Sequence, residues 1–470
     1  MGARPLGGGA HRTYATLGAP IGAGRVAGPL RKEPGQDMAR ADRTLIAGWL
    51  KLVSTNGLSG VLQFLALAIA ARALEVPALG AIALIQAYVK VIDGLFNFQS
   101  VNVLTRFLAE AEHEDNRDRF CGLIKAGFLV DGATALLATL VALVLLPFAG
   151  PLAGISLDWF GPAAIYAAVI LTRTFGVSEA VLRCFDQFWS IGLRPSGQAV
   201  LLFIGSLVAW TLGAGAQTFL YVWLGSEVVA NLGFIGWSIL VLRRRGYTKL
   251  RHADAAGAIA RSERFWPLLW QTNVTFGIRL LSQDADVLIA GGVLGPAAAG
   301  LLRAAKSVAA VVTQLGRPLQ QVASAPISRL SAQGQTIEMI RYAAKIGLAA
   351  GAASALLGVA AIFLGAFGLR LLFGPDFAEA APTLVILLFA AAVLMSGVTQ
   401  LPLTIALGES GLFLRSIIYG TIVFYLVVAL LLGALGIAGI ALAQLAFNVT
   451  AQLVCWLGVW RRRIPAAIEA

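Results

Sequence analysis

The residues of this chain that could do chemistry are charged side chains inside long apolar segments. Five of them are cations that lie well within such segments: Lys90, Arg173, Arg279, Arg303 and Lys306. A charge at the bilayer centre costs about 2.5–3.5 kcal/mol on insertion scales, so it persists where it faces protein or a water-filled cavity. Because cations hold phosphate groups well, the five residues predict a binding site for an anionic substrate group such as a phosphate or pyrophosphate.

Spacing sorts these residues by helix face, since residues three, four or seven apart lie on one side of a helix. The residues that share a face are Lys90 with Asp93, Arg303 with Lys306, and Arg279 with Asp286. The structural alternative is that the charges pair along one helix: Lys90 with Asp93, Arg279 with Asp286, and Glu179 with Arg183.

Carboxylates in the same segments are candidates for ion coupling. Asp93, Asp286 and Glu227 are the candidates for binding H⁺ or Na⁺, whereas no histidine lies in these segments to act as a near-neutral proton switch. Asp131 lies close to the predicted edge of the membrane, so we expect it to be solvated.

Other chemistry finds no support in the sequence. The three cysteines form no CxxC pair, the three histidines lie outside the apolar runs, and no phosphate-binding loop is present. We therefore expect no catalytic residue, no metal site and no cofactor, and a protein that is not an enzyme. The enzymatic alternative, a membrane glycosyltransferase or ligase, would need an external catalytic carboxylate, and Asp158, Asp376 and Glu379 are the candidates.

The composition defines the elements that must position these charges. Of 470 residues, 58% are hydrophobic and 13% are charged, about half the charge of a soluble domain, which excludes a water-soluble fold. A spanning helix needs about 20 apolar residues. The sequence predicts an all-α polytopic protein with twelve transmembrane helices, at 52–74, 81–103, 124–148, 162–182, 196–214, 218–242, 268–292, 298–318, 347–367, 383–405, 416–433 and 436–460.

The basic residues indicate how these helices are oriented. The net charge is +12, and nearly all Lys and Arg next to the predicted helices fall on one side, whereas the other side has Arg72 and Arg370. Positive charge accumulates in cytoplasmic loops, so both termini are predicted to be cytoplasmic. The charge is thus explained by membrane orientation, and we expect no nucleic-acid partner.

The longest internal loop divides the chain into two halves. We predict a disordered basic tail at 1–44, or a chain that begins at Met38, an N-lobe of helices 1–6 at 45–243, a basic cytoplasmic linker at 244–264, a C-lobe of helices 7–12 at 265–463, and a cytoplasmic C-terminal tail at 464–470. A short L-x5-G match, Leu74 to Gly80 and Leu294 to Gly300, suggests a parallel repeat at an offset of 220 residues.

Three segments carry a family resemblance. The run from Arg279 through Asp286, Leu294, Gly300 and Arg303 to Lys306, the run Leu371 to Pro382, and Gly436-Ile-Ala-Gly439 resemble the polysaccharide-transporter branch of the multidrug/oligosaccharidyl-lipid/polysaccharide exporter superfamily. The resemblance covers about 45–463. Asp286, Arg303 and Lys306 are the positions that it carries over from the family.

The resemblance implies an O-antigen, capsule or exopolysaccharide flippase. Such a protein lies in the bacterial inner membrane and moves a polyprenyl-pyrophosphate-linked oligosaccharide, with two six-helix lobes rocking around a central cavity by alternating access. Its implied partners are the lipid-linked oligosaccharide, the bilayer, a coupling H⁺ or Na⁺, and a polysaccharide polymerase with glycosyltransferases.

The main alternative is a multidrug or organic-cation antiporter of the same superfamily. Such a protein should show an excess of carboxylates within its transmembrane helices. In the first eight predicted helices, acidic and basic residues nearly balance, so depth and helix face must decide between the two functions.

Overall fold

The computed structural model describes residues 57, 59–98, 100–247 and 250–469, apart from the side chains of 251, 275, 278, 279, 282, 283, 317, 410 and 462–469. The predicted tail at 1–44 and the start of the first predicted span lie outside the described residues. Leu45–Ala470 form one compact unit. All regular structure in the described part of that unit is helical.

The first half of the unit is a series of helices joined by short turns. They are Ser59–Ala73, α2 (Val76–Phe96), α3 (Val101–His113), α4 (Arg117–Leu152), η1 (Leu157–Trp159), α5 (Phe160–Ala167), η2 (Ala168–Thr172), α6 (Gly176–Cys184), α7 (Phe188–Thr211) and α8 (Ala216–Arg244). The linker contains η3 (Leu250–His252) and α9 (Ala255–Ala260).

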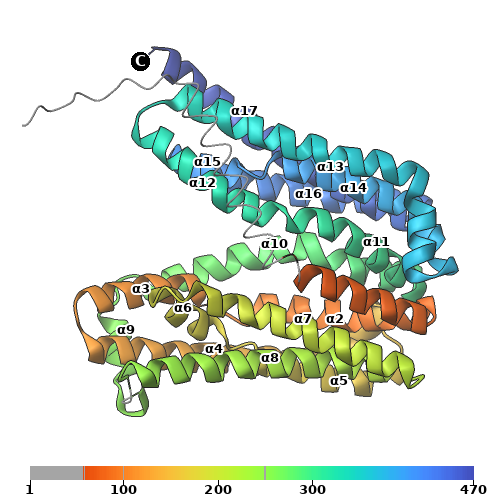
Figure 1. Cartoon of the computed structure of the whole chain (residues 1–470), viewed down its shortest axis with the longest axis horizontal. Helices are drawn as coiled ribbons and strands as arrows, with labels where there is room; N and C mark the ends of the chain where they lie inside the picture. The colour runs from red at the N-terminus through yellow and green to blue at the C-terminus, as the bar shows by residue number, and fades with distance from the viewer. Residues whose placement is uncertain (1–56, 58, 99, 248–249, 470) are drawn as a thin grey trace, which may run out of the picture. The chain divides into compact units, whose positions relative to one another are not determined.

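The second half has the same plan. Its helices are α10 (Phe265–Leu294), α11 (Pro296–Gln314), α12 (Gly316–Ala332), α13 (Thr336–Phe373), η4 (Pro375–Ala380), α14 (Ala381–Ser396), α15 (Gln400–Ala406), α16 (Ser410–Leu435) and α17 (Ile437–Glu469). In Figure 1, α13 packs along α14, and α16 packs along α17.

The molecule is a polytopic membrane protein by the length and composition of its helices. Among the described residues, nine helical segments are long and apolar enough to cross a membrane. Ser59–Ala73 is shorter, and α10 and α11 carry the charges of the candidate site. Ser59–Ala73, α10 and α11 all overlap spans that the sequence predicts. The count of twelve crossings stays a prediction.

The two halves repeat one another along their whole length. The equivalent helices begin at Val76 and Pro296, Arg117 and Thr336, Phe188 and Ser410, and Ala216 and Ile437, which are offsets of 219–222 residues. The L-x5-G match is therefore one short part of a longer structural repeat. Both copies run in the same direction, as a parallel repeat requires.

Besides the breaks between α2 and α3, within the span predicted at 81–103, and between α11 and α12, within that predicted at 298–318, two further predicted spans are interrupted. The span predicted at 162–182 is broken between η2 and α6, at Arg173–Phe175, and the span predicted at 383–405 is broken between α14 and α15, at 397–399. Glycine follows or begins each break: a Cβ on Gly176 would lie 2.9 Å from Asp131 Oδ2, and a Cβ on Gly397 would collide with Gln452. Hydropathy alone did not show these breaks, because apolar residues flank both.

The packing differs between the two ends of the bundle. We call the end where α8 finishes and α10 begins the linker end, and the opposite end the loop end. One large apolar core unites both halves from the loop end to mid-depth, with members such as Leu84, Ala138, Leu302 and Phe424. The linker end instead has two separate cores.

One linker-end core lies between α3, α4, α6, α8 and the linker, with Phe107, Phe120 and Phe265 among its buried members. The other lies between α12, α13, α15, α16 and α17, with Ile327, Met339 and Leu403. The halves thus share an apolar core at the loop end, and each has its own core at the linker end.

Candidate functional site

Three helices, α2, α10 and α11, bring basic side chains from both halves together. Lys90 Nζ of α2 lies 2.8 Å from Asp284 Oδ1 of α10. Lys306 Nζ of α11 lies 2.7 Å from both carboxylate oxygens of Asp286, also on α10. We call this group, with Arg303 and Gln86, the three-helix site.

Arg303 is the cation of this site with the weakest contact. Its Nη2 donates to Gln86 Oε1 of α2 at 3.5 Å. No carboxylate among the described residues lies within ion-pair distance of the Arg303 guanidinium. Positive charge therefore exceeds negative charge in the described part of the three-helix site.

The helices meet here because of how α2 and α11 begin. Both carry proline in the first turn, and Gly295 before α11 has a φ of +89°, which glycine adopts easily. Gly80 and Gly300 then lie against each other's helix. One to three turns further along, Gln86 and Lys90 share a face of α2, and Arg303 and Lys306 share a face of α11.

Exposure differs sharply within the site. The Lys90 side chain is 50% exposed and Asp284 is 23% exposed, whereas Lys306 is 25% exposed and its partner Asp286 is 1% exposed. Asp286 therefore depends on Lys306 as its counter-ion, because a buried carboxylate without a counter-ion is strongly unfavourable. The Lys90 pair is largely solvated.

Arg173 lies in a second charged group, inside the first half. Its Nη1 is 2.8 Å from Asp93 Oδ2 of α2, and its Nε is 2.7 Å from Glu227 Oε1 of α8. All three side chains are 11–16% exposed. We call these residues the Arg173 triad. Because Arg173 sits in the break of its span, its side chain reaches two neighbouring helices.

Amides and one tyrosine support this triad. Asn97 Nδ2 donates to Asp93 Oδ1 at 2.9 Å, and Asn231 Nδ2 donates to Thr172 Oγ1 at 3.1 Å, beside the break. Tyr166 of α5 lies between the Arg173 triad and the three-helix site. Its hydroxyl group interacts with Gln86 and, electrostatically, with the triad and with Arg303. The triad and the three-helix site are thus neighbours.

The equivalent positions of the second half carry amides and no acids. At an offset of 221 residues, Gln400 corresponds to Glu179, Asn448 to Glu227 and Gln452 to Asn231. Gln400 Nε2 donates to Gln452 Oε1 at 2.5 Å, and Asn448 Nδ2 donates to the Ala390 carbonyl at 2.8 Å. The charge at these positions is therefore confined to the first half.

One of the pairings expected along single helices is wrong, and the pairing of Arg279 with Asp286 stays a prediction. Lys90 pairs with Asp284 rather than Asp93, because α10 reaches the exposed lysine while Asp93 turns inward to Arg173. Asp286 pairs with Lys306 of α11, and the Arg279 side chain lies outside the described residues. The third pairing is confirmed: Arg183 Nη2 is 2.5 Å from Glu179 Oε1.

Asp131 is buried, which corrects the expectation that it is solvated. The residue is 1% exposed, because the break after α2 and the start of α6 close over it. Sequence reasoning placed it near the membrane edge by counting residues, and could not see that α4 continues to Arg117 and carries Asp131 well inside the helix.

Three residues near the charged groups were not predicted as site residues. Gln86 belongs to the three-helix site, and Tyr166 lies between that site and the Arg173 triad. Arg194 stacks on the Phe175 ring with its Cζ 3.9 Å from the centroid. Gln86 had one available signal, since it precedes Lys90 by one helical turn. Arg194 gave no such signal, because the basic residues next to the predicted helices are explained by membrane orientation.

The site described here has the chemistry of anion binding. Lysine and arginine cations offer charge-assisted hydrogen bonds to phosphate oxygens. Among the described residues, no group of three or more His, Cys, Asp or Glu side chains could hold a metal ion.

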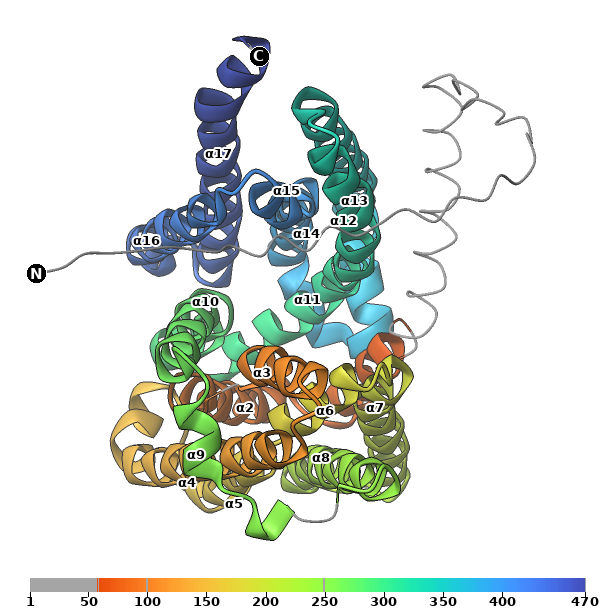
Figure 2. The same ribbon diagram turned by 90° about the vertical axis from the view of Figure 1, so that its left-hand side faces the viewer.

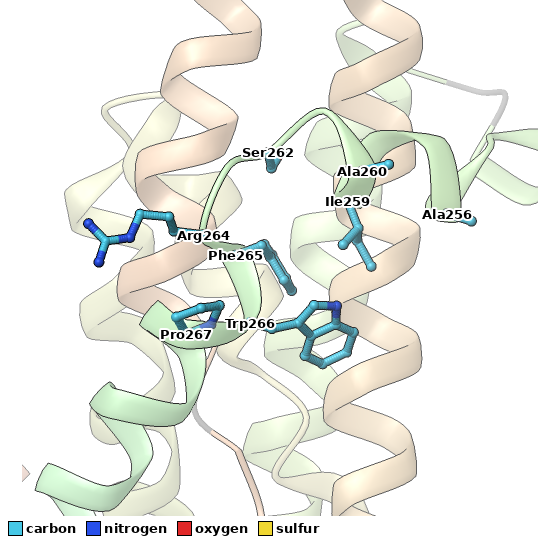
Figure 3. A pocket seen from close by; sticks show the side chains of 8 residues that line it. All are labelled: Ala256, Ile259, Ala260, Ser262, Arg264, Phe265, Trp266 and Pro267. Atoms are coloured by element: carbon cyan, nitrogen blue, oxygen red, sulfur yellow. The ribbon is translucent and has the colours of Figure 1, made fainter.

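A separate pocket of about 700 Å³ lies at the start of α10 (Figure 3) and is lined by Ile259, Phe265, Trp266 and Pro267, with Arg264 at one side. Asp284 lies 19 residues further along α10, about 28 Å at 1.5 Å per residue. This pocket is therefore distinct from the three-helix site, at which α10 and α11 both pack against α2 (Figure 2).

No family model matches the sequence. The chain is 26% identical to the inner membrane protein YghQ of Escherichia coli K12 over 340 residues, which cover 72% of this chain and 95% of YghQ.

Solved transporter structures are similar to this one. An inward-facing multidrug resistance MATE family transporter of the MOP superfamily superposes with a TM-score of 0.69, at 16% identity over 87% of this chain and 96% of that chain. The lipid II flippase MurJ in an inward closed conformation gives 0.68, at 13% identity over 87% of each chain. A point mutant of the MATE transporter VcmN of Vibrio cholerae gives 0.59, at 16% identity over 90% of this chain and 98% of that chain. The chain therefore has the fold of MOP-superfamily transporters.

Proposed function

We propose that this protein is a flippase of the bacterial inner membrane that carries a polyprenyl-pyrophosphate-linked oligosaccharide for lipopolysaccharide, capsule or exopolysaccharide assembly. The fold supports transport, because it is shared with MATE transporters and with MurJ. The similarity to YghQ supports the inner membrane. Its partners are the glycolipid and the bilayer, with a polymerase and glycosyltransferases acting before and after transport.

The excess of cations in the three-helix site is the observation on which the substrate class depends. Lys90 and Lys306 have acidic partners, and within the described residues Arg303 contacts the Gln86 amide and no carboxylate. A pyrophosphate would neutralise this charge and accept hydrogen bonds from several cations at once. The Arg279 side chain is part of the same proposal, as a further cation contributed by α10.

In this proposal the α10 carboxylates pair with the site's lysines until the substrate replaces them. Asp284 and Asp286 hold the two lysines while the site is empty. An arriving pyrophosphate takes their place, and the carboxylates recover the lysines when it leaves. This exchange keeps binding weak enough for release, which a transporter needs at both faces of the membrane.

The packing supports a state that opens toward the cytoplasm. Lysine and arginine accumulate at the linker end, so this end faces the cytoplasm under the positive-inside rule. The core shared by the halves lies at the loop end, and the separate cores lie at the linker end. Rocking of the two lobes about the shared core would expose the three-helix site to either side in turn.

A multidrug or organic-cation antiporter is the competing function. It would use a carboxylate to bind its cationic substrate, but in the described part of the site Asp284, Asp286, Asp93 and Glu227 each have a basic partner. An organic cation would have to displace a lysine or arginine of the protein. The ion pairs therefore favour the anionic substrate.

Translocation by the full chain in proteoliposomes tests the function directly. The probes are a fluorescent polyprenyl-pyrophosphate-linked disaccharide and a fluorescent lipophilic cation, each scored by its accessibility to a membrane-impermeant quencher. We expect the glycolipid to cross faster than in protein-free liposomes and the cation to cross at the background rate. Transport of the cation alone would establish the antiporter instead.

A further inference from the structure

The most deeply buried acid of the first half is not part of either charged group. Asp131 of α4 is 1% exposed. Its Oδ2 accepts a hydrogen bond from Ser100 Oγ at 2.9 Å, and its carboxyl group faces the Val177 N–H in the first turn of α6. Gly176 lies so close that a Cβ there would be 2.9 Å from Oδ2. The carboxyl group is thus enclosed by α4, the break after α2, and α6.

The second carboxyl oxygen has no hydrogen-bond partner. Asp131 Oδ1 is buried and unpartnered among the described residues, and no cation of the described part lies within ion-pair distance. An ionised carboxylate would here be a buried charge with no donor at Oδ1, whereas a protonated one is neutral, accepts at one oxygen and carries its proton on the other. The observed contacts fit the protonated acid, with Oδ2 as the acceptor and Oδ1 as the O–H oxygen.

Charged groups on the surrounding elements are already engaged with one another. On α3, Arg106 pairs with Glu110, and on α6, Glu179 pairs with Arg183. Asp93 of α2 pairs with Arg173. The remaining polar neighbours are Asn97 and Thr134, which hydrogen-bond to each other at 3.2 Å. A buried anion at Asp131 would have no counter-ion here, and that arrangement costs several kcal/mol.

A sodium ion is a poorer occupant than a proton. Hard cations take about six or more oxygen ligands, whereas one oxygen, Ser100 Oγ, is hydrogen-bonded to the Asp131 carboxyl group in the described part of the chain. The other close contact, Val177 N–H, is a donor and would repel a cation. A proton needs a single oxygen and no coordination shell.

The location of Asp131 connects it to the part of the fold that can bend. Val177 is the second residue of α6, just after the break that holds Arg173, and Ser100 belongs to the break between α2 and α3. A change in either break would move a donor away from the carboxyl group or admit water to it. Proton binding at Asp131 and the shape of the first lobe would then depend on each other.

We propose that Asp131 is a proton-binding site: in this conformation it holds a proton on Oδ1, and it releases the proton when the break before α6 rearranges. The proposal does not depend on which substrate is carried.

Infrared spectroscopy of the full chain in lipid, with ¹³C-labelled aspartate, tests the site. We expect wild-type protein at neutral pH to show the C=O stretch of a protonated aspartic acid, and the D131N variant to lose it. The D93N variant is the matched control, a buried acid of the same lobe that is ion-paired and hence ionised, so it should keep the band.

Ser100→Ala gives a second readout if Asp131→Asn does not fold. Removing the hydroxyl takes a hydrogen bond from the carbonyl oxygen, so the band should remain and move to higher frequency. A wild-type protein without the band, a band that survives D131N, or a band unmoved in S100A would each overturn the proposal. These outcomes leave the glycolipid assay unaffected, so the two proposals fail independently.

Discussion

Gly80 of α2 and Gly300 of α11 occupy equivalent positions of the repeat and lie against each other where the two halves meet. A Cβ on Gly300 would be 2.5 Å from the Val76 carbonyl oxygen and 3.1 Å from the Gly80 nitrogen. A Cβ on Gly80 would collide with the Pro296 carbonyl. Because both partners are backbone, neither helix can yield as a flexible side chain would, and the contact closes the loop end at the level of the shared core.

A larger residue at this contact should therefore hold the loop end open. In Gly300→Leu we expect a fall in glycolipid translocation of tenfold or more, and new access of a membrane-impermeant thiol reagent to a cysteine placed at Ala83, which is 4% exposed. Gly368→Leu is the control, since a Cβ there meets open space. Unchanged access of the reagent to position 83 would show that the contact between Gly80 and Gly300 does not close the loop end.

The two lysine pairs should differ in their effect on stability. Lys306→Gln leaves Asp286 buried with its main cation lost, so the free energy of unfolding should fall by about 3–5 kcal/mol. Lys90→Gln should change it by about 0–1 kcal/mol, because its pair is solvated. Chemical or thermal unfolding of the purified variants in detergent measures both, and equal losses would contradict the assigned burial.

The Arg173 triad predicts an order of destabilisation. Arg173→Gln leaves two buried acids without their cation and should be the most damaging change, whereas Asp93→Asn and Glu227→Gln each leave one ion pair intact. The triple variant R173Q/D93N/E227Q should recover part of the lost stability, since it leaves no buried charge in the triad. Unfolding midpoints supply the ranking, and a triple variant less stable than R173Q would refute this account.

Arg72 forms a second contact between the halves at the loop end, in addition to the contact of Gly80 with Gly300. Its guanidinium donates to the Leu371 and Leu372 carbonyls, with Nε 3.2 Å from the Leu372 oxygen, at the end of α13 where helix carbonyls lack partners. In Arg72→Gln we expect a larger population with a long distance between spin labels at positions 75 and 370. The control is Arg106→Gln, at the linker end. Identical distance distributions in wild-type protein and Arg72→Gln would show that the Arg72 contact does not hold the halves together.

Much of the fold could be predicted from the sequence, because a helix that crosses lipid must satisfy its own backbone and this leaves long apolar runs. The Gly80 and Gly300 match also pointed to the repeat and to its direction. What apolar runs cannot show is an interruption inside them, such as the break at Arg173, since the chain on both sides of the break is equally hydrophobic.

Less of the site could be predicted. Helix periodicity correctly grouped Arg303 with Lys306, but it assigned partners along one helix, whereas Lys90 and Asp286 find theirs on another helix. Burial was the other missing quantity: Asp131 lies close to a basic membrane edge in sequence and is enclosed in space. Such contacts depend on how α2, α4, α10 and α11 pack, and spacing along one chain does not contain that information.

Binding of the glycolipid headgroup to the three-helix site is the most direct test of the proposed function. The measurement is the dissociation constant of a short-chain polyprenyl-pyrophosphate-linked disaccharide for the wild-type chain, R303Q, and R370Q as an exposed control at the loop end. A lost charge-assisted hydrogen bond, about 1.5–3 kcal/mol, predicts binding roughly 10- to 150-fold weaker in R303Q and unchanged in R370Q. Equal affinity of all three proteins would contradict an anion site at Arg303.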